Sequence, residues 1–315
     1  MWGNYAVVAS LKTEEIMIKK RSDLYIYKAI LFIAILLLLG SCSKANVSYD
    51  VSPHLSQKEK DSLTIQNAEW DETTIKEGVV LKKVSIELFN SDQMIYVVEV
   101  DTVVANVDFA VTVEEGYALT SEQAKNHDAI VAINGTYGFG DYSSNNSRHF
   151  VKVDNVVKYH TQDREFDTRA TGVITVTNNF VDIADWNRTK ELQNAGSAEY
   201  AIVSGPLIID DGENQDMWEA NFVYDRNPRT FMALKEGHVV MGVVDGRNSA
   251  RDGMSLFELR YFAKELGYTD LINLDGGGSS TLYVKNYSVN GIVNVPSDGT
   301  ERKIKSVFYI KSKSL

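Results

Sequence analysis

The sequence predicts an α/β fold with α+β character, in which mixed, twisted β-sheets form a single globular domain. Three segments indicate this fold. The continuous apolar run from His238 to Asp245 is typical of a buried strand. Apolar side chains between Leu256 and Leu266 then recur at helical spacing, and the short apolar run Leu271-Ile272 follows. A strand, a helix and a strand in this order predict a βαβ unit.

The ends of this unit predict where a site should lie. Ser255 and Glu258 form a capping box at the helix start, and Gly267 is a C-terminal stop. A right-handed crossover would bring Asp245 and Asp275, which follow the two strands, to the same edge of the sheet, where α/β sheets hold ligands. These acids should lie about 5 Å apart on adjacent strands, or about twice that with one strand between.

The other elements are predicted from shorter patterns. Alternating and apolar stretches predict strands at residues 81–90, 94–101, 130–133 and 172–177, the first two joined by a hairpin turn at Ser91-Asp92. Residues 120–126 predict a short helix capped by Thr120 or Ser121. The apolar run 201–210 is interrupted by Ser204-Gly-Pro206, which predicts a bend or an edge strand.

The stretch from Asn273 to Thr281 is the most informative in the chain. Asp275 is followed by three glycines and then by three hydroxyl residues. Consecutive glycines are expected where the backbone needs positive φ or where a ligand touches the main chain. Successive N–H groups in such a turn also favour anions. A ligand-free turn would explain two glycines, but the third glycine, the acid and the hydroxyls together indicate a site.

Five blocks of the sequence carry a resemblance to the phosphodiester glycosidase family, over roughly Val79 to Ile310. In chain order the blocks are Ala132-Ile-Asn-Gly-Thr-Tyr137, Asn227-Pro-Arg-Thr230, Val244-Asp-Gly-Arg247, Asn273-Leu-Asp-Gly-Gly-Gly-Ser-Ser-Thr281, and Pro296-Ser-Asp-Gly299 with Arg302. The resemblance implies mixed β-sheets and cleavage of a sugar-1-phosphodiester or a related glycosidic bond. The chain departs from the family pattern at Gly138 and in the loop 138–149, which puts the sugar specificity in question because loops usually carry it.

Most glycosidases use two carboxylates, one for the leaving oxygen and one for water or nucleophilic attack. The candidate catalytic residues are Asp245, Asp275 and Asp298, and each could instead be a turn-forming aspartate. The candidate substrate-binding residues are Asn134, Gly135, Arg229, Arg247, Gly276, Gly277, Gly278, Ser279, Ser280 and Arg302. The arginines are candidates because a guanidinium group binds phosphate through two hydrogen bonds. The alternative for each arginine is a solvated ion pair on the surface. His149 is a weaker candidate for lining the site.

Charge and composition limit the partners. The net charge of −11 disfavours nucleic acid, so a carbohydrate or sugar-phosphodiester substrate is expected to meet local cations instead. The sequence requires no cofactor. The acids Asp210, Asp211, Glu213 and Asp216 could hold Ca²⁺ or Mg²⁺, and an acidic surface turn is the favoured interpretation.

The amino end predicts a bacterial lipoprotein of the cell envelope, periplasmic or surface-exposed. Basic residues precede an eleven-residue apolar run, Ala29 to Leu39, which suits a signal peptide and is too short to span a membrane. The run ends at Leu39-Gly-Ser-Cys42, which resembles a lipobox with Cys42 as the lipidated residue. We expect residues 1–41 to be a signal peptide, with 1–16 untranslated if Met17 is the start. Residues 42–76 would be a polar tether and 77–315 the globular domain.

Two functions of different classes fit these observations. One is a hydrolase that cleaves a sugar phosphodiester or glycoside in the cell envelope. The other is a non-catalytic lipoprotein that binds envelope glycan in the same cleft. Two acids at one sheet edge favour the hydrolase, because a binding protein does not need them.

The lipid anchor gives the first prediction. Cys42→Ala should leave the protein soluble or unprocessed, because the lipidated thiol is its only expected attachment to the membrane. Membrane fractionation and the mass of the mature chain measure this, and a Cys42→Ala protein that stays in the membrane fraction would contradict it. A chain that begins at Glu77 is expected to fold and retain activity.

Overall fold

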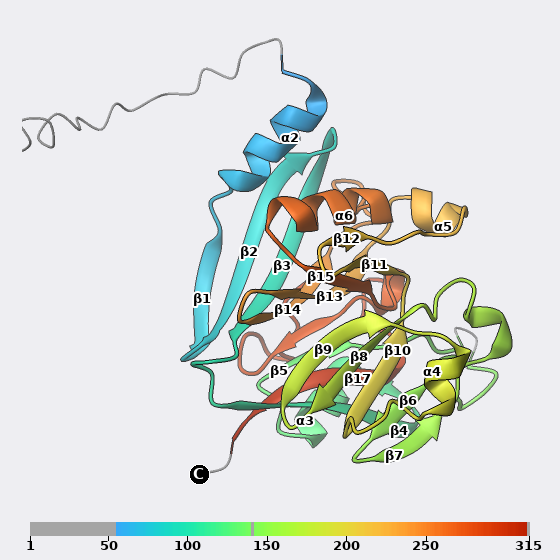
Figure 1. Cartoon of the computed structure of the whole chain (residues 1–315). Coiled ribbons are helices and arrows are strands. Elements are labelled where there is room, and N and C mark those ends of the chain that lie inside the picture. The colour runs from blue at the N-terminus through green and yellow to red at the C-terminus, as the bar shows by residue number, and fades with distance from the viewer. Residues whose placement is uncertain (1–54, 140–141, 314–315) are drawn as a thin grey trace, which may run out of the picture. The chain divides into compact units, whose positions relative to one another are not determined.

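The computed structural model describes residues 55–139 and 142–313, and residues 55–315 form one compact unit (Figure 1). Every strand pairing within the described residues is antiparallel. The largest sheet has the order β1 (Asp71–Lys76), β2 (Val79–Leu88), β3 (Ser91–Asp101), β14 (His238–Val244), β13 (Arg229–Lys235), β15 (Asp270–Asn273), β11 (Leu207–Asp210), β12 (Glu213–Asn214).

Two smaller sheets and the helices complete the unit. The five-stranded sheet has the order β7 (Val156–Tyr159), β6 (Val151–Val153), β10 (Tyr200–Ser204), β8 (Gly172–Thr177), β9 (Phe180–Asp185). The four-stranded sheet has the order β16 (Leu282–Val284), β5 (Val131–Asn134), β17 (Lys303–Ser312), β4 (Val107–Leu119). The helices are α2 (Gln57–Gln66), α3 (Thr120–Asn126), α4 (Arg188–Leu192), α5 (Asn221–Tyr224), α6 (Leu256–Glu265), and the short 3₁₀ turns η1 (Asp163–Glu165) and η2 (Gly277–Ser279).

The central strands of the large sheet are buried on both faces. Val98 and Met241 point into a core shared with strands of the two smaller sheets. Their chain neighbours, Val97 and Val240, point to the opposite face and pack in a second core with helix residues such as Phe262. Successive side chains of a strand alternate between faces, so a strand buried on both sides must be apolar throughout. This explains why the β14 segment reads as a continuous apolar run.

The predicted strand–helix–strand unit is present as β14, α6 and β15. Ser255 and Glu258 form the expected capping box at the start of α6, since the main-chain N–H of each donates to the side chain of the other, at 2.8 and 3.2 Å. Strand β13 pairs antiparallel with both β14 and β15, so these two strands run in the same direction with β13 between them. The acids that follow β14 and β15 therefore leave the same edge, one strand apart, which is the wider of the two spacings expected.

Several local predictions are confirmed and others are wrong. Strand β8 and helix α3 lie where predicted, and the run 201–210 divides at the cis peptide Gly205-Pro206 into β10 and β11, which belong to different sheets. The hairpin turn lies at Phe89-Asn90, both with φ near 56°, and not at Ser91-Asp92, because the main chain of Phe89 is held by Asp61 of α2. The N-cap of α3 is Leu119, because Thr120 and Ser121 are already helical and buried.

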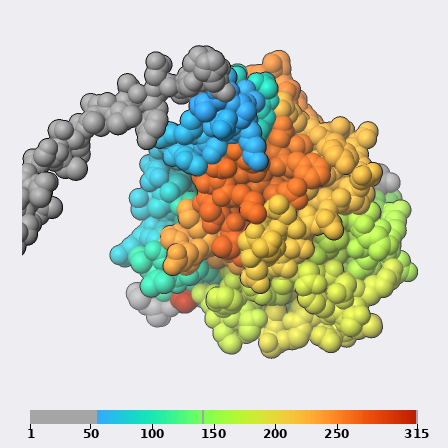
Figure 2. Space-filling model, turned by 45° about the horizontal axis from the view of Figure 1, so that its top comes forward, coloured from blue at the N-terminus to red at the C-terminus, as the bar shows by residue number. Residues whose placement is uncertain are grey.

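The globular unit begins earlier than the predicted boundary at residue 77. Strand β1 pairs with β2, and α2 packs on α6 through hydrogen bonds from Ser62 to Glu265 and from Tyr261 to the carbonyl of Lys58. Figure 2 shows this blue helix lying against the orange segment that contains α6. A chain meant to fold alone should therefore begin at Leu55. The predicted signal peptide, Cys42 and residues 42–54 lie outside the described residues.

The part of the chain that the structure describes contains no helix that is both long enough and apolar enough to cross a membrane.

Candidate active site

The glycine-rich loop after β15 is a tight turn that its own backbone holds closed. Gly277 has φ near +60°, which glycine adopts without strain, and its N–H donates to the carbonyl of Pro228 (2.9 Å). The N–H groups of Ser279 and Ser280 donate to Gly276 and Gly277 within the turn. These three donors are committed to the protein, so they do not form the anion-binding nest that the sequence suggested. The cationic side chains around the loop are further candidates for anion contacts.

Asn134 fixes the position of Asp275. Its Nδ2 donates to the main-chain carbonyl of Asp275 (2.6 Å), and its Oδ1 accepts from the Thr230 hydroxyl (3.0 Å) and the Thr281 N–H (2.9 Å). The carbonyl of Gly135 accepts the N–H of Asp275 (3.1 Å). The amide of Asn134 is fully buried and has partners at both ends. Asn134 and Gly135 therefore both hold the main chain of Asp275 in place.

Two cavities meet at Asp275. Their volumes are about 220 and 200 Å³, and both are lined by Tyr137, Arg169, Asp275 and Arg302. The first is completed by Tyr117, Gly138, Phe139, Tyr142, Arg148, Ser279, Lys303 and Ile304. The second is completed by Phe222, Asn227, Pro228, Arg229, Arg247, Gly276 and Gly277. Together they form one two-part cleft with Asp275 where the parts join.

The charges around this cleft are unequal. Among the described residues that line it, Asp275 is the one acid, and the cations are Arg148, Arg169, Arg229, Arg247, Arg302 and Lys303. Burial raises the pKa of the Asp275 carboxyl to about 6, although a hydrogen bond from Ser279 and the nearby arginines oppose that rise. A carboxyl with this pKa is mostly ionised at neutral pH and can still accept a proton. The cleft thus combines a candidate proton acceptor with a group of cations.

Asp245 lies behind the glycine-rich loop. Its side chain is 1% exposed and accepts from the N–H of Val295 (3.2 Å) and the hydroxyl of Tyr96 (3.3 Å). Asn294, which lies 3.5 Å from the same carboxylate, also donates to the carbonyl of Ser280 (3.0 Å). Burial raises the pKa of Asp245 to about 6. Asp245 lines neither part of the cleft, and its contacts link the end of β14 to the loop that carries Asp275.

Asp298 and Arg302 form an ion pair over the loop. Nε and Nη2 of Arg302 donate to one oxygen of Asp298, at 2.9 and 2.6 Å. A Cβ on Gly278 would lie 2.2 Å from Asp298 and 2.3 Å from Arg302, so the pair rests directly on the glycine backbone. The geometry makes Asp298 the residue that aims Arg302. Ser279 and Ser280 are both almost fully buried beneath this surface.

The two arginines from the remaining blocks differ. Arg229 is 1% exposed, and its Nε and Nη2 donate to the carbonyls of Met254, Phe222 and Asp225 at 2.7–2.9 Å. These bonds hold the Arg229 guanidinium to main-chain carbonyls, while the residue still lines the second cavity. Arg247 is exposed, donates through Nε and Nη2 to the side chain of Asn227, and reaches over Gly277. It remains a candidate for contact with a ligand.

Sequence reasoning missed Arg148 and Arg169 as site residues. Arg148 lies in the loop that departs from the family pattern, beside His149, and that position was the one available signal. Arg169 follows η1 in a charged segment without a recognisable motif. The candidate His149 is fully buried behind the ring of Tyr137, 5.1 Å from it, and does not line the cleft.

Within the described residues, no three His, Cys, Asp or Glu side chains are grouped so that they could hold a metal ion. The acidic segment from Asp210 to Glu213 is the turn between β11 and β12, as the favoured interpretation has it.

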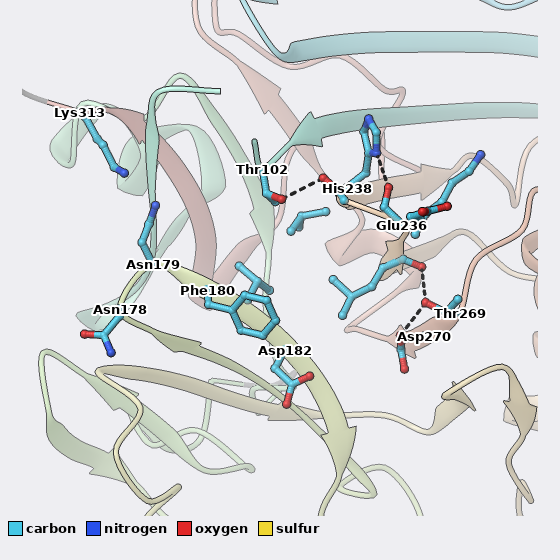
Figure 3. Close-up of a pocket in the computed structure, with 15 residues that line it drawn as sticks. Thr102, Asn178, Asn179, Phe180, Asp182, Glu236, His238, Thr269, Asp270 and Lys313 are labelled. Carbon is cyan, nitrogen blue, oxygen red and sulfur yellow. Dashed lines mark hydrogen bonds between the residues drawn. The ribbon is translucent and has the colours of Figure 1, made fainter. Parts of the chain in front are cut away.

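A larger cavity of about 630 Å³ lies at the opposite ends of β14 and β15, beside His238 and Asp270 (Figure 3). Its lining includes Phe180 and Asp182 and contains none of the candidate residues. The smaller cleft is the candidate active site, because the family blocks, the arginines and the carboxyl of raised pKa meet there.

Known proteins of similar sequence and structure define the class of this protein. A family model described as phosphodiester glycosidase matches residues 127–311, more than half of the chain. The structure resembles the catalytic domain of zebrafish N-acetylglucosamine-1-phosphodiester alpha-N-acetylglucosaminidase auto-inhibited by its pro-peptide, with a TM-score of 0.59, 19% identity and coverage of 78% of this chain and 88% of that one. A hypothetical protein from Synechocystis gives a TM-score of 0.60, 13% identity and coverage of 77% and 63%.

The chain belongs to the phosphodiester glycosidase family. It spans less than two thirds of the Synechocystis protein, and at these low identities the likeness to both structures shows a shared fold. No curated protein matches the chain.

The contact between the loop and the ion pair gives the second prediction. Gly278→Ala should displace Arg302 from the cleft, because the new Cβ would overlap both members of the Asp298–Arg302 pair. We expect binding of inorganic phosphate to weaken by about tenfold, which is the loss of one charge-assisted contact. Calorimetric titration measures it, with Arg302→Ala as the matched variant. Unchanged phosphate affinity in Gly278→Ala would show that Arg302 does not face the anion.

Proposed function

We propose that this protein hydrolyses a sugar-1-phosphodiester at the C1–O bond. The observation that carries the proposal is the single carboxylate, Asp275, set in a cleft whose other charged lining residues, among those described, are cations. Membership of the phosphodiester glycosidase family supports hydrolysis of this kind.

The composition of the cleft favours a phosphorylated leaving group over an alcohol. An alcohol leaves as a strong base and needs a second carboxyl to protonate it, as in most glycosidases. A phosphate monoester is already a weak base, so positive charge is sufficient to stabilise it as it leaves. One carboxylate with several arginines therefore fits a phosphodiester better than a neutral glycoside.

The proposed step uses Asp275 as the proton acceptor. A water molecule attacks the anomeric carbon and gives one proton to the carboxylate of Asp275 as the new C–O bond forms. The bond from the anomeric carbon to the phosphate oxygen breaks, and its electron pair leaves with the phosphate monoester. Arg302 and Arg169, which line both parts of the cleft, would meet the charge that develops there.

A non-catalytic glycan-binding role is the second candidate. Its support is the aromatic wall of the first cavity, where Tyr117 and Tyr142 pack edge to face at 4.9 Å and Phe139 lies beside them. Such rings also serve an enzyme that must hold its sugar. The raised pKa of Asp275 favours the enzyme, because a binding site gains nothing from a carboxyl that titrates near neutrality.

We also propose that the protein acts in the bacterial cell envelope and is held to a membrane by lipid on Cys42 alone. The support is the basic and apolar amino end and its lipobox-like sequence. The Cys42→Ala fractionation described above tests this part, and it does so independently of the chemistry.

The third prediction separates the two acids whose pKa is raised. Asp275→Asn should lower kcat by about 10²-fold or more, the range for loss of a general base, while substrate still binds. Asp245→Asn should lower kcat by less than about tenfold, because Asp245 acts only by supporting the loop that carries Asp275. The new asparagine side chain keeps an oxygen that can accept the N–H of Val295. Turnover of a sugar-1-phosphodiester and thermal melts of both variants measure this. If Asp245→Asn lost as much turnover as Asp275→Asn, Asp245 would have to reach the substrate.

The fourth prediction concerns pH. The carboxyl of Asp275 faces Arg148, Arg169, Arg302, Tyr137 and Ser279, and its pKa is raised from 3.8 to about 6. Because the ionised form is the base and this pKa is that of the protein without substrate, kcat/KM should fall about tenfold per pH unit below pH 6 and level off above it. A folded-state control, circular dichroism from pH 4 to about 8, excludes unfolding as the cause. A rate that stays constant down to about pH 4 would contradict the role of Asp275 as a base.

A further inference from the structure

Glu165, at the end of η1, is a buried carboxylate that joins two arginines of the cleft. Its side chain is 1% exposed. It accepts from Nε and Nη2 of Arg169 at 3.1 and 3.2 Å, and from Nη1 of Arg148 at 3.2 Å. Neither Glu165 nor these bonds belong to any of the family blocks. A charge buried this deeply is stable only with such partners.

These bonds fix which way the two guanidinium groups face. Arg169 lies over the ring of Tyr137 at 5.0 Å, and Arg148 lies over the ring of Phe139 at 4.5 Å and donates through Nε to the carbonyl of Gly138. Both arginines line the first cavity, and Arg169 also lines the second. Within the described residues, Nη1 of Arg169 and Nη2 of Arg148 are not used in these bonds, so each keeps donors for a ligand.

The ring of His149 packs behind Glu165. Nε2 of His149 lies 3.5 Å from its second oxygen, and Nδ1 of His149 is 2.9 Å from the hydroxyl of Thr136. Burial lowers the pKa of His149, so this ring is neutral at pH 7. Burial alone would raise the pKa of Glu165, but the contact with the His149 ring and the bonds and charges of Arg169 and Arg148 outweigh it and lower the pKa to about 2. Glu165 is therefore a fixed negative charge across the whole working pH range.

Arg302 and Arg247 have weaker partners, and Arg229 is bonded to neutral carbonyls. Arg302 is paired with Asp298, whose side chain is 40% exposed, and Arg247 is bonded to the neutral amide of Asn227. An exposed pair is screened by water and contributes little to holding a side chain still. Arg148 and Arg169 are thus the cleft arginines with a fully buried anionic partner in the described part of the chain.

We propose that Glu165 is a positioning residue that holds Arg148 and Arg169 as a preformed clamp for the phosphate of the substrate. The inference rests on the proposed function for the identity of the anion. A free arginine loses rotamer freedom when it binds a ligand, and a partner that fixes it beforehand removes that cost from binding. Glu165 would therefore act on substrate affinity through the arginines without touching the substrate.

The test is Glu165→Gln in the full chain, with Glu191→Gln as the matched control. Glu191 is also a buried carboxylate, bonded to His160, the N–H of Thr161 and the indole of Trp186, but it contacts no arginine of the cleft. Both changes remove one buried charge and should lower the melting temperature. Only Glu165→Gln should weaken binding of inorganic phosphate, by about tenfold or more, and it should raise KM for a sugar-1-phosphodiester more than it lowers kcat.

A double-mutant cycle separates positioning from general damage. In a chain that carries Arg148→Ala and Arg169→Ala, adding Glu165→Gln should change phosphate affinity by less than about twofold, because the clamp is already gone. A further tenfold loss in that background, or parent-like phosphate affinity in Glu165→Gln alone, would overturn the proposal. If Glu165→Gln does not fold, Glu165→Asp takes its place in the cycle. Phosphate affinity is then measured for Glu165→Asp alone and in the chain that lacks both arginines, and the same outcomes apply.

The two proposals can fail separately. A parent protein that binds phosphate in a Glu165-dependent way and cleaves no phosphodiester would retain the clamp and refute the proposed hydrolysis. A parent that cleaves phosphodiester, with Glu165→Gln behaving like Glu191→Gln, would retain the hydrolysis and refute the clamp.

Discussion

The buried amide of Asn134 is the interaction on which the site depends. It stands at the end of β5 and bonds to the start of β13 through Thr230, to the start of β16 through Thr281, and to the main chain of Asp275. Strands of two different sheets are joined at this one side chain. Removing the amide of Asn134 would leave buried polar groups of these partners unsatisfied, at a cost of about 1–3 kcal/mol for each group. The loop that carries Asp275 is therefore fixed by buried hydrogen bonds to Asn134.

The second constraint is the separation of charge. The chain is acidic as a whole, yet its cleft is lined by cations. The arginines that face the cleft have a protein acceptor for part of the guanidinium: Glu165 for two of them, Asp298 for Arg302 and Asn227 for Arg247. This arrangement keeps several positive charges close together without a ligand and leaves some donors facing the cleft. It suits a ligand that is small and anionic.

The sequence predicted what local patterns determine. Apolar spacing and a capping box predicted the unit of β14, α6 and β15. Asp275 was chosen as a candidate catalytic residue because three glycines follow it. The same reasoning could not place Arg148 and Arg169, because tertiary packing alone brings their loops to the cleft. It could not tell Arg229 from Arg247 either, since both lie in family blocks and only the fold shows that carbonyls occupy Arg229. The predicted start of the globular domain at residue 77 was wrong, because α2 is polar in sequence and only its contacts with α6 show that it belongs to the domain.

The most direct test of the account is the preference between two substrates that share one sugar. One carries a phosphodiester at the anomeric carbon and the other a neutral alcohol of similar size. A cleft with one carboxylate and several arginines should favour the phosphodiester in kcat/KM by about 10³-fold or more, because the arginines would face the neutral group without an anionic partner. Equal kcat/KM values for the two substrates would contradict the claim that the arginines stabilise a phosphate leaving group.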